Sequence, residues 1–324
     1  CTAPTNVKDY SAYVNPFIGT GGHGHTFPGA VVPHGMIQPS PDTRIDGWDA
    51  CSGYYYADST INGFSHTHVS GTGCCDYGDV LLMPTVGKQQ YRTTDPQSQR
   101  LAYASSFSHK NEIAEPGYYS VFLDTYQVKA EISSTKRGAI HRYTFPENTE
   151  SGFIIDLDYS LQRQTNSEME IEVISDTEIC GHKKTTYWAF DQYINFYAKF
   201  SKPFSYTLVT DSITMDNGKR LPVCKALLHF NTNKDEQVLV KVGVSAVDIA
   251  GARKNVESEI PGWDFEKVRK DARTAWNEYL SKIDITTSDK EDKAIFYTAL
   301  YHTGISPNLF TDADLSLIHI SEPT

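Results

Sequence analysis

The first quarter of the chain carries residue types that bind metal ions in other proteins. Two His-x-His pairs are followed by two adjacent cysteines: His23 and His25, His66 and His68, Cys74 and Cys75. Two histidines spaced by two on a strand share one face, and imidazole with thiolate is a zinc ligand set. Isolated pairs are a weak signal, because histidines among glycine and serine commonly bond the backbone. We therefore favour histidines that hold loops in place, and keep a zinc-dependent enzyme at this His/Cys cluster as the weaker hypothesis.

Trp48 stands between Gly47 and Asp49 in a segment that reads as a loop. An exposed indole stacks on the apolar faces of ligands, sugar rings included. The alternative is a tryptophan that closes a loop onto the core, which is the commoner role of this residue type. Both interpretations stay open on local sequence alone.

Two further groups of polar residues have simple explanations. Asp76 and Asp79 flank Gly78, but a calcium ion takes six to eight oxygens, so carboxylate bonding within a turn is favoured. Gly19, Gly21 and Gly22 superficially suggest a phosphate-binding loop. No strand-to-helix context surrounds these glycines, so nucleotide binding is rejected.

The stretch from 15 to 79 must position most of these side chains. Glycine and proline interrupt it every few residues, which excludes a mainly helical structure. Such sequence predicts loops in fixed backbone conformations on a scaffold, and loops of this kind commonly carry binding groups.

The scaffold is predicted by alternation of apolar and polar residues between about 86 and 247. Val128, Ala130 and Ile132 alternate with polar residues, and the longest such run extends from Val238 to Ala246. Alternation with a period of two is typical of antiparallel strands with one buried face. Turn-forming residues at 115–117, 146–148, 216–218 and 231–233 separate the runs. The fold class predicted is mainly β, a large antiparallel β-sandwich.

Two helices are expected after Pro261. Apolar residues recur at three and four from Phe265 to Ile283, with Asp264 as the N-cap. A second helix over 288–304 begins with a capping box formed by Ser288 and Glu291. An apolar helix near the end of a sequence needs partners, so these helices are predicted to begin a further domain.

Composition limits the class of protein. The chain has 324 residues, 39% hydrophobic and 21% charged, which is typical of globular proteins, and a net charge of −11 argues against nucleic acid. The sequence contains no run of 18 apolar residues, so no transmembrane helix is predicted. The first residue is Cys1, as in a processed bacterial lipoprotein, so a lipid anchor at Cys1 is expected. The other five cysteines show no repeated spacing, and no disulfide framework is predicted.

Several motifs are more specific than composition. They include YVNPFIGT at 13–20, PGA at 28–30, PHGM at 33–36, GWD at 47–49, SGY at 52–54, GFSHTHVSGTG at 63–73, EPGYY at 115–119 and PNLF at 307–310. Together they resemble glycoside hydrolase family 92, the calcium-dependent, inverting exo-α-mannosidases. The resemblance covers roughly residues 10–314.

The resemblance implies an architecture and a division of labour. In the family a β-sandwich packs on an (α/α)6 barrel, and the barrel supplies the general acid, the general base and most calcium ligands. It implies a tether at 1–10, a sandwich at 11–255 and the first barrel helices at 256–314. Residues 315–324 depart from the family pattern, and we interpret them as foreign. Most of the barrel is then missing, so no catalytic residue and no metal ligand is assigned within this chain.

The resemblance also implies substrate contacts within this sequence. Trp48 and Asp49 would face the sugar, His66 and His68 could touch it, and Asp312 would accept sugar hydroxyl bonds. The expected partners are mannose-containing glycans and the chain's own missing C-terminal barrel, with Ca²⁺ as cofactor of the full enzyme. The hypothesis is an N-terminal part of an exo-α-mannosidase acting on N-glycans or mannan, inactive alone, in a periplasmic or outer-membrane lipoprotein. The alternative is a stand-alone carbohydrate-binding β-sandwich.

Overall fold

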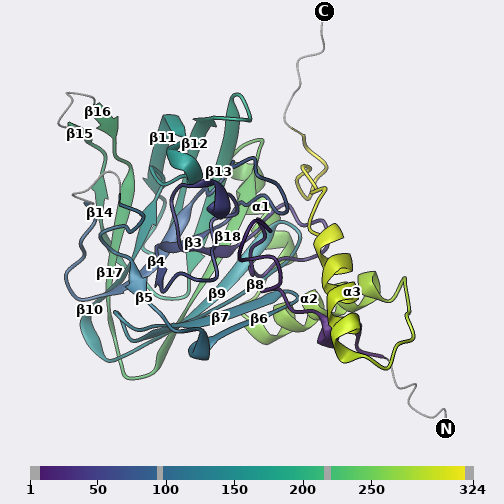
Figure 1. Ribbon diagram of the computed structural model, residues 1–324. Helices are drawn as coiled ribbons and strands as arrows, with labels where there is room; N and C mark the ends of the chain where they lie inside the picture. The colour runs from purple at the N-terminus through teal and green to yellow at the C-terminus, as the bar shows by residue number, and fades with distance from the viewer. Residues whose placement is uncertain (1–7, 93–97, 215–219, 318–324) are drawn as a thin grey trace, which may run out of the picture.

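Two antiparallel sheets form the body of the molecule in a computed structural model that describes residues 8–92, 98–214 and 220–317 (Figure 1). The six-stranded sheet has the order β1 (Ser40–Asp42), β3 (Gly63–Ser65), β4 (Leu81–Val86), β10 (Asn148–Asp156), β17 (Lys225–Thr232), β14 (Ser205–Val209). The eight-stranded sheet has the order β11 (Thr165–Val173), β12 (Glu178–Thr186), β13 (Gln192–Phe200), β18 (Glu236–Ser245), β9 (Gly138–Phe145), β8 (Val128–Ser134), β7 (Tyr118–Leu123), β6 (Glu112–Glu115). Two short ribbons complete the strands: β2 (Thr60–Ile61) with β5 (Ser105–Ser106), and β15 (Ser212–Thr214) with β16 (Arg220–Pro222). The predicted antiparallel β-sandwich is confirmed.

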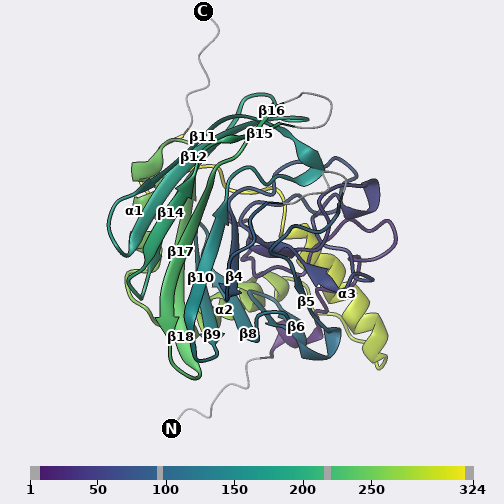
Figure 2. The ribbon, with the colours of Figure 1, turned by 90° about the vertical axis from the view of Figure 1, so that its left-hand side faces the viewer.

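The predicted alternation places one face of each strand in the core between the sheets. Val238, Val240 and Val242 of β18 are buried there, and Val128 and Ala130 of β8 join the same apolar cluster. Leu239 and Lys241 of β18 belong to the opposite face, where the Lys241 ammonium donates to the Ile260 carbonyl beside the first helix. Figure 2 shows four strands of the six-stranded sheet, β14, β17, β10 and β4, running side by side.

Three α-helices follow the last strand. They are α1 (Ile249–Glu259), α2 (Phe265–Leu280) and α3 (Lys290–Thr303). The predicted cap of α2 is confirmed, because the Asp264 side chain accepts from the Lys267 amide. The predicted capping box of α3 is wrong, since Asp289 is the N-cap and accepts from the Glu291 amide at 2.7 Å. Helix α1 was not predicted from the sequence, and it crosses the predicted domain boundary at 255.

The helices α2 and α3 pack on the loop-rich N-terminal stretch rather than standing apart (Figure 1). A second apolar cluster joins them to it: Phe27, Val31, Tyr54, Trp276, Leu280, Tyr297, Tyr301 and Ile305. The Trp276 indole N–H donates to the Val31 carbonyl at 2.6 Å within this cluster. Burial of several aromatic side chains, each worth on the order of 1.5–3 kcal/mol, fixes the loops against the helices.

Some expectations fall on residues outside this description. The predicted lipid site at Cys1, most of the tether at 1–10, the turn at 216–218 and most of the segment 315–324 lie there. These expectations stay predictions. None of the helices in the described part of the chain is long and apolar enough to cross a membrane.

Candidate functional site

Trp48 lies at the start of a short 3₁₀ turn, η2 (Trp48–Ala50), on the loop-rich face. Gly47 enters this turn with a φ of +106°, a conformation that side-chain-bearing residues rarely adopt. A Cβ at Gly73 would lie 2.5 Å from the Trp48 Nε1 atom, so only glycine allows the two loops to approach this closely. The indole is nevertheless 56% exposed, which agrees with the exposed indole considered from sequence.

A disulfide between Cys51 and Cys75 ties the turn at Trp48 to the loop that contains Gly73. The sequence predicted no disulfide framework, so this single bond was missed. The sequence spacing gave no sign of it, because the two residues are 24 apart and Cys74 and Cys75 are adjacent. Cys74 keeps a free, exposed thiol, and Cys180 and Cys224 are buried free cysteines.

Two imidazoles flank Trp48. The ring centroids of His23 and Trp48 are 4.9 Å apart, and the His25 ring meets the indole edge-on at 4.4 Å. The Nδ1 atom of His23 lies 2.6 Å from an Asp49 carboxylate oxygen. His23 is exposed, whereas His25 is 6% exposed and its Nε2 atom has no hydrogen-bond partner. We call Trp48, Asp49, His23 and His25 the indole rim.

His66 belongs to the second His-x-His pair but lies in the protein interior rather than at this surface. It is fully buried, with its Nδ1 atom 2.7 Å from the Val80 carbonyl oxygen and its Nε2 atom 3.1 Å from the Nε2 atom of His141. The carbonyl requires a proton on Nδ1 of His66, so His141 donates to His66, and the Tyr143 hydroxyl donates to Nδ1 of His141 at 2.9 Å. Burial lowers the pKa of His66 to about 4 and also lowers the pKa of His141 well below its usual value. Both imidazoles are therefore neutral near pH 7.

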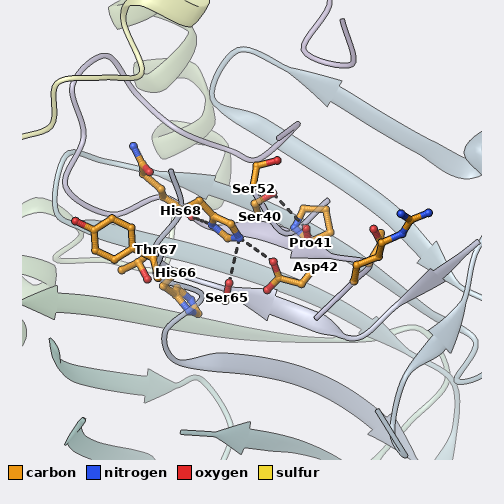
Figure 3. Close-up of polar contacts among 12 residues, drawn as sticks. Ser40, Pro41, Asp42, Ser52, Ser65, His66, Thr67 and His68 are labelled. Atoms are coloured by element: carbon orange, nitrogen blue, oxygen red, sulfur yellow. Dashed lines mark hydrogen bonds and ion pairs between the residues drawn. The ribbon is translucent and has the colours of Figure 1, made fainter. Parts of the chain in front are cut away.

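His68 is equally buried and joins three segments of the loop region (Figure 3). Its Nδ1 atom lies 2.7 Å from the Gln38 carbonyl oxygen, and its Nε2 atom lies 2.9 Å from an Asp42 carboxylate oxygen. Asp42 and His68 therefore form a fully buried hydrogen-bonded pair. We call His66, His68, Asp42 and His141 the buried histidine core.

Ser65, His68 and Asp42 contain the three residue types of a hydrolase triad, but their arrangement excludes that chemistry. The Ser65 hydroxyl and the Asp42 carboxylate meet the same imidazole atom, Nε2, at 3.1 and 2.9 Å. A triad needs the carboxylate on one ring nitrogen and the hydroxyl on the other. All three side chains are buried, and a Cβ at Gly53 would lie 2.0 Å from the Asp42 oxygen, so the carboxylate is tightly packed.

Asp312 is buried at the junction of β18 and α1. One carboxylate oxygen accepts from the Ser245 hydroxyl and the other from the Asn255 side-chain amide, each at 2.7 Å. A Cβ at Gly251 would lie 2.2 Å from it. Asp312 therefore anchors the C-terminal segment to the helix start. Its bond to a sugar hydroxyl stays a prediction, as do the sugar contacts of His66 and His68. A sugar at any of these three residues would have to share or replace the hydrogen bonds described here.

A mainly apolar cavity of about 390 Å³ opens beside the loop 66–77. It is bordered by His68, Asp76 and Cys74, by β13 and β18, and by the segment 306–310. The Asp76 carboxylate accepts from the Ala189 amide at 2.8 Å, and burial raises the pKa of Asp76. The indole rim does not border this cavity, although Gly73 and Cys74 connect the two regions along the chain.

The described side chains do not match a calcium site. One group of three or more His, Cys, Asp or Glu side chains in the described ranges lies close enough to share an ion, and it consists of His23, His25 and Asp49. Calcium prefers six to eight oxygens, which this group does not offer. Asp79 instead accepts from Thr67 and Gln192 and pairs with the buried Lys183 ammonium at 3.0 Å. These partners are distant in sequence, so the expected bonding within a turn is wrong for Asp79. The zinc cluster considered around His66, His68 and the adjacent cysteines does not form, because those imidazole nitrogens are engaged and Cys75 is in a disulfide.

An exposed indole on a braced loop can stack on a sugar ring, and comparison with known proteins identifies the class of protein that carries it here. The family model for the glycosyl hydrolase family 92 N-terminal domain matches residues 13–245, and that for the family 92 catalytic domain matches 251–320. The chain therefore belongs to glycosyl hydrolase family 92.

Individual relatives agree with this assignment. The family 92 α-mannosidase BT3965 from Bacteroides thetaiotaomicron is 36% identical over 95% of this chain, with a TM-score of 0.87. The inverting mannosidase BT2199 from the same organism is 26% identical over 96% of the chain, with a TM-score of 0.79. An uncharacterized secreted glycosidase from Arthroderma benhamiae is 30% identical over 94% of the chain. The chain spans about two fifths of each relative, 42%, 41% and 42% respectively.

Proposed function

We propose that this chain is the N-terminal part of an inverting exo-α-mannosidase that hydrolyses terminal α-linked mannose of N-glycans or mannan. The observation that carries the proposal is the similarity to BT3965, at a TM-score of 0.87 across 95% of the chain. A BT3965 structure also exists with mannoimidazole bound. Secretion to the periplasm or cell surface belongs to the same proposal and is supported by the secreted relative. Lipid on Cys1 stays a prediction.

In this proposal the sandwich forms one wall of the sugar pocket, and the indole rim is the contact surface. Trp48 offers an exposed apolar face to a sugar ring, and Asp49 beside it offers acceptors for sugar hydroxyls. The buried histidine core and Asp312 would hold the loops that carry this wall. Inverting hydrolysis needs two carboxyl groups roughly 6.5–9.5 Å apart. We assign the general acid, the general base and the calcium ligands to the remainder of the catalytic domain.

The proposal predicts different behaviour for the 324-residue chain and for the full-length enzyme. The chain alone should release no mannose from an α-mannoside, whereas the full-length enzyme should release β-mannose first, as NMR of the fresh product would detect. Retention of configuration by the full-length enzyme, or turnover by the purified chain, would overturn the corresponding part of the proposal.

One observation favours the alternative, a carbohydrate-binding sandwich that works without a barrel. Helices α2 and α3 are already packed on the N-terminal loops through buried aromatic residues, including Trp276 and Tyr297. A monomeric chain with full helix content by circular dichroism and with measurable mannoside binding would support this module. Aggregation of the isolated chain through exposed apolar residues such as Ile295, which is 54% exposed on α3, would count against it.

A further inference from the structure

The three polar side chains of the indole rim converge around one point. A ring nitrogen of His23, a ring nitrogen of His25 and a carboxylate oxygen of Asp49 all lie within 4.8 Å of one another. His23 and His25 come from the glycine-rich loop after residue 19, and Asp49 comes from η2. Two imidazole nitrogens and one carboxylate oxygen suit a divalent transition metal such as zinc, which binds three protein ligands plus water in open sites.

A second feature of the rim points to a missing ligand. His25 is only 6% exposed, yet its Nε2 atom has no hydrogen-bond partner in the structure. Buried polar atoms are normally paired, and an unpaired one calls for an explanation such as an ion. In the buried histidine core, by contrast, both nitrogens of His66 and both of His68 have partners.

We propose that His23, His25 and Asp49 bind one divalent transition-metal ion, with Zn²⁺ the best-matched candidate, beside the indole of Trp48. A tetrahedral zinc ion with ligands about 2.0–2.1 Å away holds those ligand atoms about 3.3 Å apart. Ligand atoms that lie up to 4.8 Å apart must therefore move closer together around the ion. If Nδ1 of His23 and Oδ1 of Asp49 both bind it, their 2.6 Å contact must lengthen.

The backbone allows this adjustment on one side and resists it on the other. A Cβ at Gly22 would meet nothing within 4 Å, so the loop that carries exposed His23 has space to move. A Cβ at Gly24 would lie 2.2 Å from the Gly19 carbonyl oxygen, and the Gly71 amide donates to the His25 carbonyl at 2.7 Å. His25 is thus the fixed ligand and His23 the adjustable one.

The test is calorimetric titration of the metal-free 324-residue chain with zinc chloride. We expect one ion per chain, with affinity lowered at least tenfold in His23→Ala and in Asp49→Ala. His23 is exposed, so its replacement leaves the fold intact even if a change at buried His25 does not. His229→Ala is the matched control, since it removes a half-exposed imidazole from β17, outside the cluster.

Two further measurements make the result specific. Cys74→Ser should bind zinc as the unchanged chain does, and X-ray absorption should show nitrogen and oxygen neighbours without sulfur. Ni²⁺ should quench tryptophan fluorescence less in Trp48→Phe, with unchanged calorimetric affinity. Absence of binding at millimolar zinc or loss of binding in Cys74→Ser would overturn the proposal. So would a zinc affinity of His23→Ala and Asp49→Ala equal to that of the unchanged chain. None of these outcomes depends on mannosidase activity.

Discussion

The indole rim and the buried histidine core contain the same His-x-His spacing but differ in almost every physical respect. His66 directly follows β3, and its backbone amide bonds the Asp79 carbonyl while its own carbonyl accepts from the Gln38 amide. Its ring therefore points into the sandwich. His25 lies in a loop with a φ of +52°, and its partner His23 is exposed. The comparison teaches that backbone context, rather than spacing, decides whether such a pair serves stability or binding.

The largest expected difference between the two regions concerns their aspartates. Asp42→Ala leaves the buried Nε2 atom of His68 without its carboxylate partner, and a buried polar group that loses its partner costs up to about 3 kcal/mol. Asp49→Ala removes a partly exposed carboxylate beside exposed His23, so we expect a change within about 1 kcal/mol. Urea denaturation of both variants measures the difference, and equal losses of stability would remove the distinction between core and rim.

The second prediction concerns acid. The pKa of His66 is about 4 in the folded chain and 6.5 in the unfolded one, so the unfolded state binds more protons between these values. The contribution of His66 is fully present above about pH 6.5 and is lost as the pH falls toward about 4. The loss is on the order of 3 kcal/mol, at about 1.4 kcal/mol for each pH unit. His141, whose pKa is also lowered, adds to the same trend.

Denaturation midpoints measured between pH 7 and 4 test this prediction. The slope of stability against pH should be smaller in His66→Phe than in the unchanged chain, whatever the absolute stability of that variant. His23→Ala is the control, and its slope should match that of the unchanged chain. A slope that His66→Phe leaves unaltered would show that other groups cause the acid sensitivity.

The third prediction concerns sugar binding at the rim. Trp48→Ala in the full-length enzyme should weaken binding of mannosides by roughly 0.5–1.5 kcal/mol, the usual value of an aromatic contact, or about two- to tenfold. Trp188→Ala is the matched control, because Trp188 is also exposed, at 63%, but lies outside the rim. Steady-state kinetics and calorimetry report the change. If Trp188→Ala had the larger effect, the sugar-binding wall would have to be moved to the β12–β13 hairpin.

The strands were predictable from sequence because one buried face produces alternation, as in Val238, Val240 and Val242. Helix α1 was not, since its buried face consists of Gly251, Ala252, Asn255 and Val256 and therefore shows no apolar stripe. It packs through small side chains instead: a Cβ at Gly243 would lie 2.1 Å from the Ala252 carbonyl oxygen. Close backbone packing of this kind leaves no hydrophobic period to detect.

The candidate site was predictable only in part, for a related reason. A sugar-facing Trp48 was anticipated from the family motif, whereas its local sequence left a core tryptophan equally open. The approach of Asp49 to His23 was not, because it depends on the Cys51–Cys75 bond and on close contact at Gly73. These are long-range features with no local sequence signal. The burial of Asp312 in bonds to Ser245 and Asn255 has the same character.

The smallest expected change in stability, that of His23→Ala, separates the indole rim most clearly from the buried histidine core. His23→Ala should change the free energy of unfolding by no more than about 0.5 kcal/mol, as for exposed positions that hold no buried group. The same variant should lose zinc affinity at least tenfold under the proposal above. Urea denaturation and calorimetry on one preparation separate the two effects. A stability loss above about 1 kcal/mol would make His23 a structural residue like His66. Its bond to Asp49 would then stabilise the loop, and the metal-binding role would not be needed to explain it.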